Sequence, residues 1–145
     1  MEEKTSGICA GGGARKSRVA FVCVRNSCRS QIAECLGKLL AGDVFESYSA
    51  GTTIGDKIDA DAVRLMKKLY GADMEKTQYC KRLSQIPKPD ATILMGCNVN
   101  CPLPASAYWE NWGLEDPVGK SDEEYERVIR TIEKKILALK EKLQR

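Results

Sequence analysis

The chain has 145 residues, enough for one domain with its own hydrophobic core. Hydrophobic residues make up 43% of it and charged residues 30%, and its net charge of +3 is small, so the composition offers little support for nucleic-acid binding. The sequence contains no histidine, which excludes histidine-based catalytic triads and most zinc enzymes.

Two further features of the sequence, the length of its apolar runs and the character of its N-terminus, point to a reducing compartment. No apolar run approaches the roughly 20 residues that a membrane span needs, and the N-terminus lacks the apolar core of a signal peptide. We therefore expect a cytoplasmic protein that binds no membrane. Its seven cysteines, an odd number, favour reactive or metal-binding thiols over a structural disulfide framework there.

The N-terminal segment, residues 1–17, has few large apolar side chains and contains AGGGARKS. We predict a flexible leader here, followed by a single domain over residues 18–145. The leader differs from a nucleotide-binding P-loop because Arg15 stands where that motif requires its second glycine.

Predicted strands and helices alternate through the domain. Strands are predicted at 19–24, 44–49, 91–95 and 107–112, and helices at 30–40, 58–70 and after Ser121, where Glu124 completes a capping box. This alternation favours a parallel sheet covered on both faces. We predict a three-layer, flavodoxin-like α/β domain with a four-stranded parallel sheet and helices on both faces. Ligands of such folds bind beyond the carboxyl ends of the strands, where Cys23 falls.

The stretch CVRNSCRS, residues 23–30, joins the first strand to the first helix. Five residues separate Cys23 from Arg29, and a loop of this length can turn successive N–H groups inward above a helix N-terminus. We predict an oxyanion cradle formed by Val24, Arg25, Asn26, Ser27, Cys28 and Arg29. Arg29 adds a fork of donors for two oxygens, and the same positive field stabilises a thiolate at Cys23.

Two neighbours complete the predicted loop. Ser30 can donate a hydrogen bond to the Cys23 thiolate, and Asn26 can brace the loop. The simpler alternative is a buried cysteine at a strand end beside a surface arginine, and the full stretch CVRNSCRS argues against it.

The segment VCVRNSCRSQ, residues 22–31, is similar to the phosphate-binding loop of the low-molecular-weight protein tyrosine phosphatases. It resembles more closely that of the arsenate reductases built on the same fold. YSAGT at 48–52 and NWGLEDPVGKSDEEY at 111–125 match in the expected order, and the resemblance covers about residues 18–143. Arg25 stands where the phosphatases usually have glycine; we expect the loop to accept this side chain, which adds positive charge at its rim.

Asp116 is the predicted general acid, because a carboxylic acid held near the anion can protonate a departing oxygen. An Asp-Pro pair is usually just a turn; the cysteine–arginine loop upstream favours the catalytic interpretation. By the resemblance, the phosphatases carry aromatic residues just after this pair, whereas Val118 and Gly119 follow Pro117 here. A stacking surface for a phenol ring is therefore missing, which favours a reductase.

A second pair of cysteines, Cys97 and Cys101, follows the third predicted strand. Two small buried residues are the simpler explanation, and zinc is disfavoured because no second clear pair and no histidine exist. The similar arsenate reductases carry such a pair, which implies a redox relay. In it Cys23 attacks arsenate while Asp116 protonates the leaving oxygen. Cys97 then attacks Cys23 as arsenite leaves, and Cys101 attacks Cys97, leaving a disulfide for an external dithiol such as thioredoxin.

Some relatives bind potassium through residues matched here by Asn26, Glu34 and Ser49, but no aspartate stands at the fourth position, around Gln78 and Tyr79. No organic cofactor is implied.

The sequence thus predicts a monomeric, thiol-dependent arsenate reductase whose loop also binds phosphate or sulfate. Two alternatives stay open: a low-molecular-weight protein tyrosine phosphatase, and a non-catalytic oxyanion-binding or redox-sensing module. Packing is the expected role of Cys28, Cys35 and Cys80. For Cys28, which lies inside the loop, a backup thiol is the alternative role. Cys9 lies in the leader.

Overall fold

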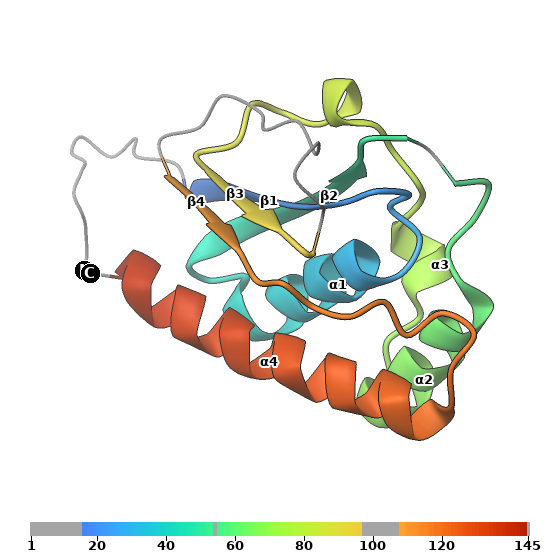
Figure 1. Cartoon of the computed structure of the whole chain (residues 1–145). Coiled ribbons are helices and arrows are strands. Elements are labelled where there is room, and N and C mark those ends of the chain that lie inside the picture. The colour runs from blue at the N-terminus through green and yellow to red at the C-terminus, as the bar shows by residue number, and fades with distance from the viewer. Residues whose placement is uncertain (1–15, 54, 97–107, 145) are drawn as a thin grey trace, which may run out of the picture.

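The computed structural model describes residues 16–53, 55–96 and 108–144. Figure 1 shows a sheet backed by a layer of helices. The elements in chain order are β1 (Ser17–Cys23), α1 (Arg29–Ala41), β2 (Phe45–Gly51), α2 (Ala60–Tyr70), α3 (Met74–Thr77), the 3-10 helix η1 (Leu83–Gln85), β3 (Ala91–Leu94), β4 (Tyr108–Asn111) and α4 (Asp122–Gln144).

The strands form one four-stranded sheet in the order β2-β1-β3-β4, and every neighbouring pair is parallel. β1 lies inside the sheet and pairs with β2 from Ser17 opposite Phe45 to Cys23 opposite Gly51. The predicted parallel sheet is therefore confirmed. All carboxyl ends of the strands meet at one edge, and Cys23 ends β1 there.

Helices lie on both faces of the sheet, but unequally. The face that carries Val19 and Phe21 packs against α1, α2 and α4 and forms the main core, as Figure 1 shows for α1 and α4. The opposite face, which carries Val22, is covered by Leu83 of η1 and by Ile86. Because α1 starts at Arg29, the loop after β1 rests directly on the main core.

The helix ends follow their sequence signals. Asp59 caps α2 by accepting a hydrogen bond from the Ala62 N–H at 3.1 Å, and Gly71 ends this helix with a φ of 69°. At the start of α4, Ser121 Oγ accepts a hydrogen bond from the Glu124 N–H at 3.3 Å. The second helix begins after the predicted residue 58 because Asp59 serves as its cap.

Three features differ from or extend the predicted pattern. Neither α3 nor η1 is predicted, since elements of 4 and 3 residues are too short to show a period. β1 begins at Ser17, inside the segment predicted as a leader, and Lys16 Nζ donates to Gly42 O at 2.7 Å. Residues 1–15 lie outside the described residues, so the leader stays a prediction. No helix in the described ranges is long and apolar enough to cross a membrane.

Candidate active site

The loop of residues 24–28 is held by its carbonyl groups. Four carbonyl groups of residues 23–27 accept hydrogen bonds from the segment after β2: Thr52 N–H to Cys23 O at 3.2 Å, Thr53 N–H to Val24 O at 2.8 Å, Gly55 N–H to Arg25 O at 3.0 Å and Asp59 N–H to Ser27 O at 2.8 Å. Asn26 O accepts from Gln31 Nε2 at 2.9 Å. A trans peptide group points its N–H away from its C=O. The N–H groups of residues 24–28 therefore face away from these partners.

Four of the five residues that carry those N–H groups line a cavity. Within the described residues these N–H groups donate to no protein acceptor, and the cavity, about 250 Å³, is lined by Cys23, Val24, Arg25, Ser27, Cys28, Arg29 and Asp116. Free N–H groups above a helix N-terminus attract an anion. The structure thus brings the predicted nucleophile, most of the predicted cradle and the predicted acid to one cavity.

The Cys23 sulfur lies 2.8 Å from Ser30 Oγ. Asn26 Nδ2 donates to the same hydroxyl oxygen at 2.8 Å, so it occupies an acceptor site of Ser30 and leaves the hydroxyl hydrogen for the sulfur. A hydroxyl in this position can donate a hydrogen bond to an attacking sulfur. This pairing is what a nucleophilic Cys23 requires.

Asn26 is the turning point of the loop. Its φ of 55° is the only positive φ among the described non-glycine residues, so Arg25 adopts an ordinary conformation, as expected. The Asn26 side chain is fully buried, and its Oδ1 accepts from Lys81 N–H at 2.8 Å and from Gln31 Nε2 at 2.9 Å. Gln78 Nε2 in turn donates to Gln31 Oε1 at 2.7 Å.

Sequence reasoning missed the three partners Gln31, Gln78 and Lys81. Lys81 stands 55 positions from Asn26 in the chain, and nothing in its neighbourhood marks it as a partner of the loop. Only the fold brings these residues together.

Arg29 is clamped between two other loops. Its Nη1 donates to Leu114 O at 2.7 Å and to Met95 O at 3.1 Å. Gly96, with a φ of 123°, leaves room for this arrangement, because a Cβ there would lie 2.6 Å from Arg29 Nη1 and 2.5 Å from Leu114 O. Arg29 is therefore already placed against the cavity that it lines.

Gly51, the glycine of YSAGT, permits the loop to approach β2. A Cβ at this position would lie 2.8 Å from Val24 O and 2.9 Å from Asn26 N. The match of this short segment to the family thus has a steric reason.

Asp116 reaches the same cavity from the segment between β4 and α4. Its Oδ1 accepts a hydrogen bond from the Val118 N–H at 3.1 Å, while Pro117 beside it is buried. An exposed carboxyl fixed in this way can exchange protons with solvent and deliver one to a bound oxyanion.

The other described thiols are poor nucleophiles. Burial, followed by the charges of Asp59 and Asp116, raises the pKa of Cys28 far above its usual range. Burial also raises the pKa of Cys35 to about 11 and shifts the pKa of Cys80 upward. Thiols with raised pKa values stay protonated at neutral pH, which agrees with packing roles.

The predicted relay cysteines Cys97 and Cys101, together with Cys9, lie outside the described residues.

Asn26, Glu34 and Ser49, which match the potassium ligands of some relatives, all lie against Lys81. The ammonium of Lys81, however, is 3.3 Å from Glu34 Oε1 and 3.4 Å from Ser49 Oγ. These residues therefore do not fit a potassium site.

With the geometry established, comparison with known proteins gives the family. Residues 18–100 match the model of the low molecular weight phosphotyrosine protein phosphatases. The chain belongs to this family. Arsenate reductase 1 of Staphylococcus epidermidis is 35% identical over 123 residues, which cover 79% of this chain and 88% of that protein.

Solved structures of arsenate reductases share the fold. One in the phosphate binding state superimposes with a TM-score of 0.78 at 29% identity, covering 88% of this chain and 98% of that one. The thioredoxin-dependent arsenate reductase of Corynebacterium glutamicum superimposes with a TM-score of 0.72 at 26% identity, covering 91% of this chain and 64% of that one.

Proposed function

We propose that this protein reduces arsenate to arsenite, with Cys23 as the nucleophile. The carrying observation is the cavity bordered by loop N–H groups, which also contains Cys23, Arg29 and Asp116. Relatives that are named arsenate reductases support arsenate as the oxyanion.

In the first step the Cys23 thiolate attacks arsenic and displaces one oxygen. The loop N–H groups and Arg29 stabilise the negative charge on the other oxygens. Asp116, in its acid form, protonates the departing oxygen so that it leaves as water. The product is an arsenic–sulfur bond at Cys23.

The electrons come from thiols. Cys97 attacks the Cys23 sulfur, the sulfur–arsenic bond breaks, and its electron pair stays on arsenic, which leaves as arsenite. Cys101 then attacks Cys97, which frees Cys23 and leaves a Cys97–Cys101 disulfide. An external dithiol protein, proposed to be thioredoxin by similarity to the thioredoxin-dependent relative, reduces that disulfide. Such a cycle needs the reducing conditions of the cytoplasm, and the protein is proposed to act there as a monomer.

The decisive experiment supplies the purified protein with thioredoxin, thioredoxin reductase and NADPH. We expect arsenate-dependent NADPH oxidation and only weak hydrolysis of aryl phosphates. Weak hydrolysis is expected because the exposed Val118 and Gly119 offer no aromatic wall for a phenol ring. Fast phosphotyrosine hydrolysis without arsenate-dependent NADPH oxidation would assign the protein as a phosphatase, and neither activity would leave an oxyanion-binding module.

Single-cysteine variants test the relay. Cys101→Ser should stall after one arsenite per protein, and peptide mapping should find a Cys23–Cys97 disulfide. Cys97→Ser should release little arsenite, because no thiol is placed to attack Cys23. Cys35→Ser is the matched control and should keep turning over. Sustained turnover by Cys97→Ser would contradict the relay.

A further inference from the structure

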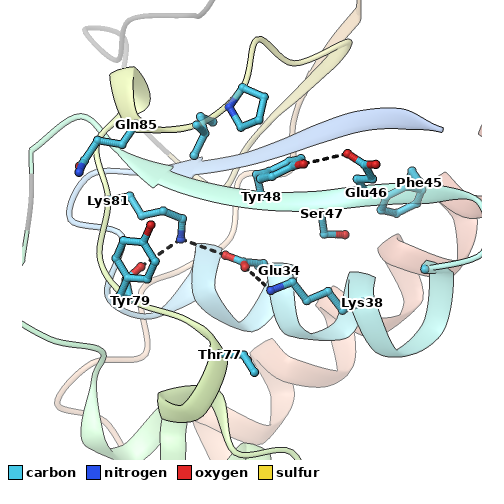
Figure 2. Close-up of a pocket in the computed structure, with 13 residues that line it drawn as sticks. Glu34, Lys38, Phe45, Glu46, Ser47, Tyr48, Thr77, Tyr79, Lys81 and Gln85 are labelled. Atoms are coloured by element: carbon cyan, nitrogen blue, oxygen red, sulfur yellow. Dashed lines mark hydrogen bonds and ion pairs between the residues drawn. The ribbon is translucent and has the colours of Figure 1, made fainter. Parts of the chain in front are cut away.

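A lysine side chain lies buried beside residues 23–29, called the phosphate loop below. The Lys81 side chain is 7% exposed, and its ammonium donates to three oxygens: Tyr79 O at 3.0 Å, Glu34 Oε1 at 3.3 Å and Ser49 Oγ at 3.4 Å. Figure 2 shows the ammonium between Tyr79 and Glu34. An ammonium has three N–H donors, so each one has a partner.

The carboxylate of this cluster is equally buried. Glu34, whose side chain is 5% exposed, also accepts a hydrogen bond from Ser49 Oγ at 2.5 Å and pairs with Lys38 Nζ at 2.6 Å. Glu34 lies on α1 and Ser49 on β2, while Lys81 lies between α3 and η1. One ammonium thus joins three parts of the fold.

The main chain of Lys81 extends this contact to the loop. Its N–H donates to Asn26 Oδ1 at 2.8 Å, and its C=O accepts from Gly51 N–H at 2.8 Å. Asn26 holds Ser30, which holds the Cys23 sulfur. A displacement of Lys81 would therefore reach the nucleophile through two hydrogen-bonded side chains.

We propose that Lys81 is a built-in cation that positions the phosphate loop, so that the loop works without a monovalent metal ion. A carboxylate, a hydroxyl and a carbonyl oxygen are the ligands that hard cations take in proteins, and here an ammonium occupies their centre. Because it is covalently attached, it stays at the site at any salt concentration. Lys81 acts on Cys23 through Asn26 and Ser30 and is a positioning residue.

The first test needs no variant. Phosphate binding to the wild-type protein is measured by calorimetry in potassium chloride and in choline chloride at equal ionic strength. We expect the same phosphate affinity and the same melting temperature in both salts. A wild-type affinity that rises several-fold in potassium overturns the proposal, whatever the variants do.

The second test removes the ammonium and replaces it from solution. Lys81→Ala keeps the main-chain bonds to Asn26 and Gly51 but removes the ammonium from Glu34 Oε1 and Ser49, while Lys38 stays paired with Glu34 Oε2. In choline chloride we expect phosphate affinity to fall about tenfold or more, as for loss of hydrogen bonds to a charged group. Potassium or methylammonium should restore it, because a cavity of about 460 Å³ lined by Glu34 and Lys81 admits small ions.

Two variants complete the design. Lys81→Met fills the same space without a charge and should show the loss without the rescue. Lys38→Ala removes the more exposed lysine, 43% exposed, from the same carboxylate and should create no cation dependence. The inference is refuted if Lys81→Ala binds phosphate as tightly as the wild-type protein does. It is also refuted if neither potassium nor methylammonium restores the lost phosphate affinity. Arsenate turnover in the two salts would be a kinetic test of the same inference, but it rests on the proposed function. The phosphate-binding measurements do not rest on it, so the two proposals can fail separately.

Discussion

Asn26 supplies both the backbone conformation and several of the hydrogen bonds on which the loop depends. It adopts a φ of 55°, which asparagine tolerates better than most residues. Its amide donates to Ser30 and accepts from Lys81 and Gln31. Glycine would suit the backbone but could make none of these bonds, so both halves of the amide are needed.

Asp116 should matter for chemistry rather than for binding. We expect Asp116→Asn to slow the first, single-turnover step by about 10² to 10⁴, the usual effect of losing a positioned acid, while phosphate affinity changes little. Rapid-quench measurement of arsenic–sulfur bond formation checks this. Glu115→Gln, at the neighbouring exposed carboxylate, is the control. Unchanged kinetics in Asp116→Asn would show that Asp116 only shapes its loop and does not act as an acid.

The cysteine thiols should also differ in their reactivity toward alkylation at neutral pH. Because burial raises the pKa of Cys35 to about 11 and that of Cys28 higher still, both remain protonated at neutral pH and gain thiolate only as the pH approaches those values. Iodoacetamide near neutral pH should therefore label Cys23 before either of them. Mass spectrometry of the labelled peptides measures the order, and early labelling of Cys28 would contradict it.

At the scale of elements, the first residues after the strands position the proposed catalytic groups. Gly96 follows β3 and leaves space for Arg29, while Gly51 ends β2 and leaves space for Val24 and Asn26. A side chain at either position would push on the phosphate loop rather than on the core.

Gly96→Ala tests this role. The new Cβ would displace Arg29 from Leu114 O, so phosphate binding should weaken strongly. Gly113→Ala is the matched control: its φ of 59° is also positive, but a Cβ there meets nothing within 4 Å. It should lose only about 1 kcal/mol of stability from backbone strain and keep its phosphate affinity, as calorimetry and thermal melting would show. Equal binding by both variants would contradict the steric argument.

The same scale explains what the sequence could predict. The run from Cys23 to Ser30 is contiguous, and its residue types are typical of an anion-binding loop. Most of the residues that line the cavity could therefore be predicted from the sequence. The contacts of Lys81 and Gln78 were not, because they depend on how the segment after α2 folds back over α1. The helices over 58–70 and after Ser121 were predictable from their period and caps, whereas α3 and η1 are too short to show a period.

At the scale of the whole molecule, all four strands contribute to one site. Cys23 ends β1, Thr53 follows β2, Gly96 follows β3 and Asp116 follows β4. A parallel sheet gathers these positions at one edge. Binding an anion there links the ends of every strand and should therefore stabilise the entire fold.

Thermal melting measures that linkage. Phosphate or sulfate should raise the melting temperature of the wild-type protein, because a ligand present at 100 times its dissociation constant adds about 2.7 kcal/mol to the free energy of unfolding. Arg29→Met should lose most of this gain. An unchanged melting temperature of the wild-type protein at tens of millimolar phosphate would show that the folded protein does not bind the anion at the predicted cradle.

The peptide N–H groups of the cradle recognise a tetrahedral shape and a negative charge, and they have no means to tell one central atom from another. Arsenate and phosphate share both properties, so the proposed enzyme must discriminate after binding, at the step where only one of the two can accept an electron pair. Phosphate is then a dead-end competitor of the true substrate. A cell rich in phosphate would slow its own detoxification, and arsenate reduction would be fastest where phosphate is scarce.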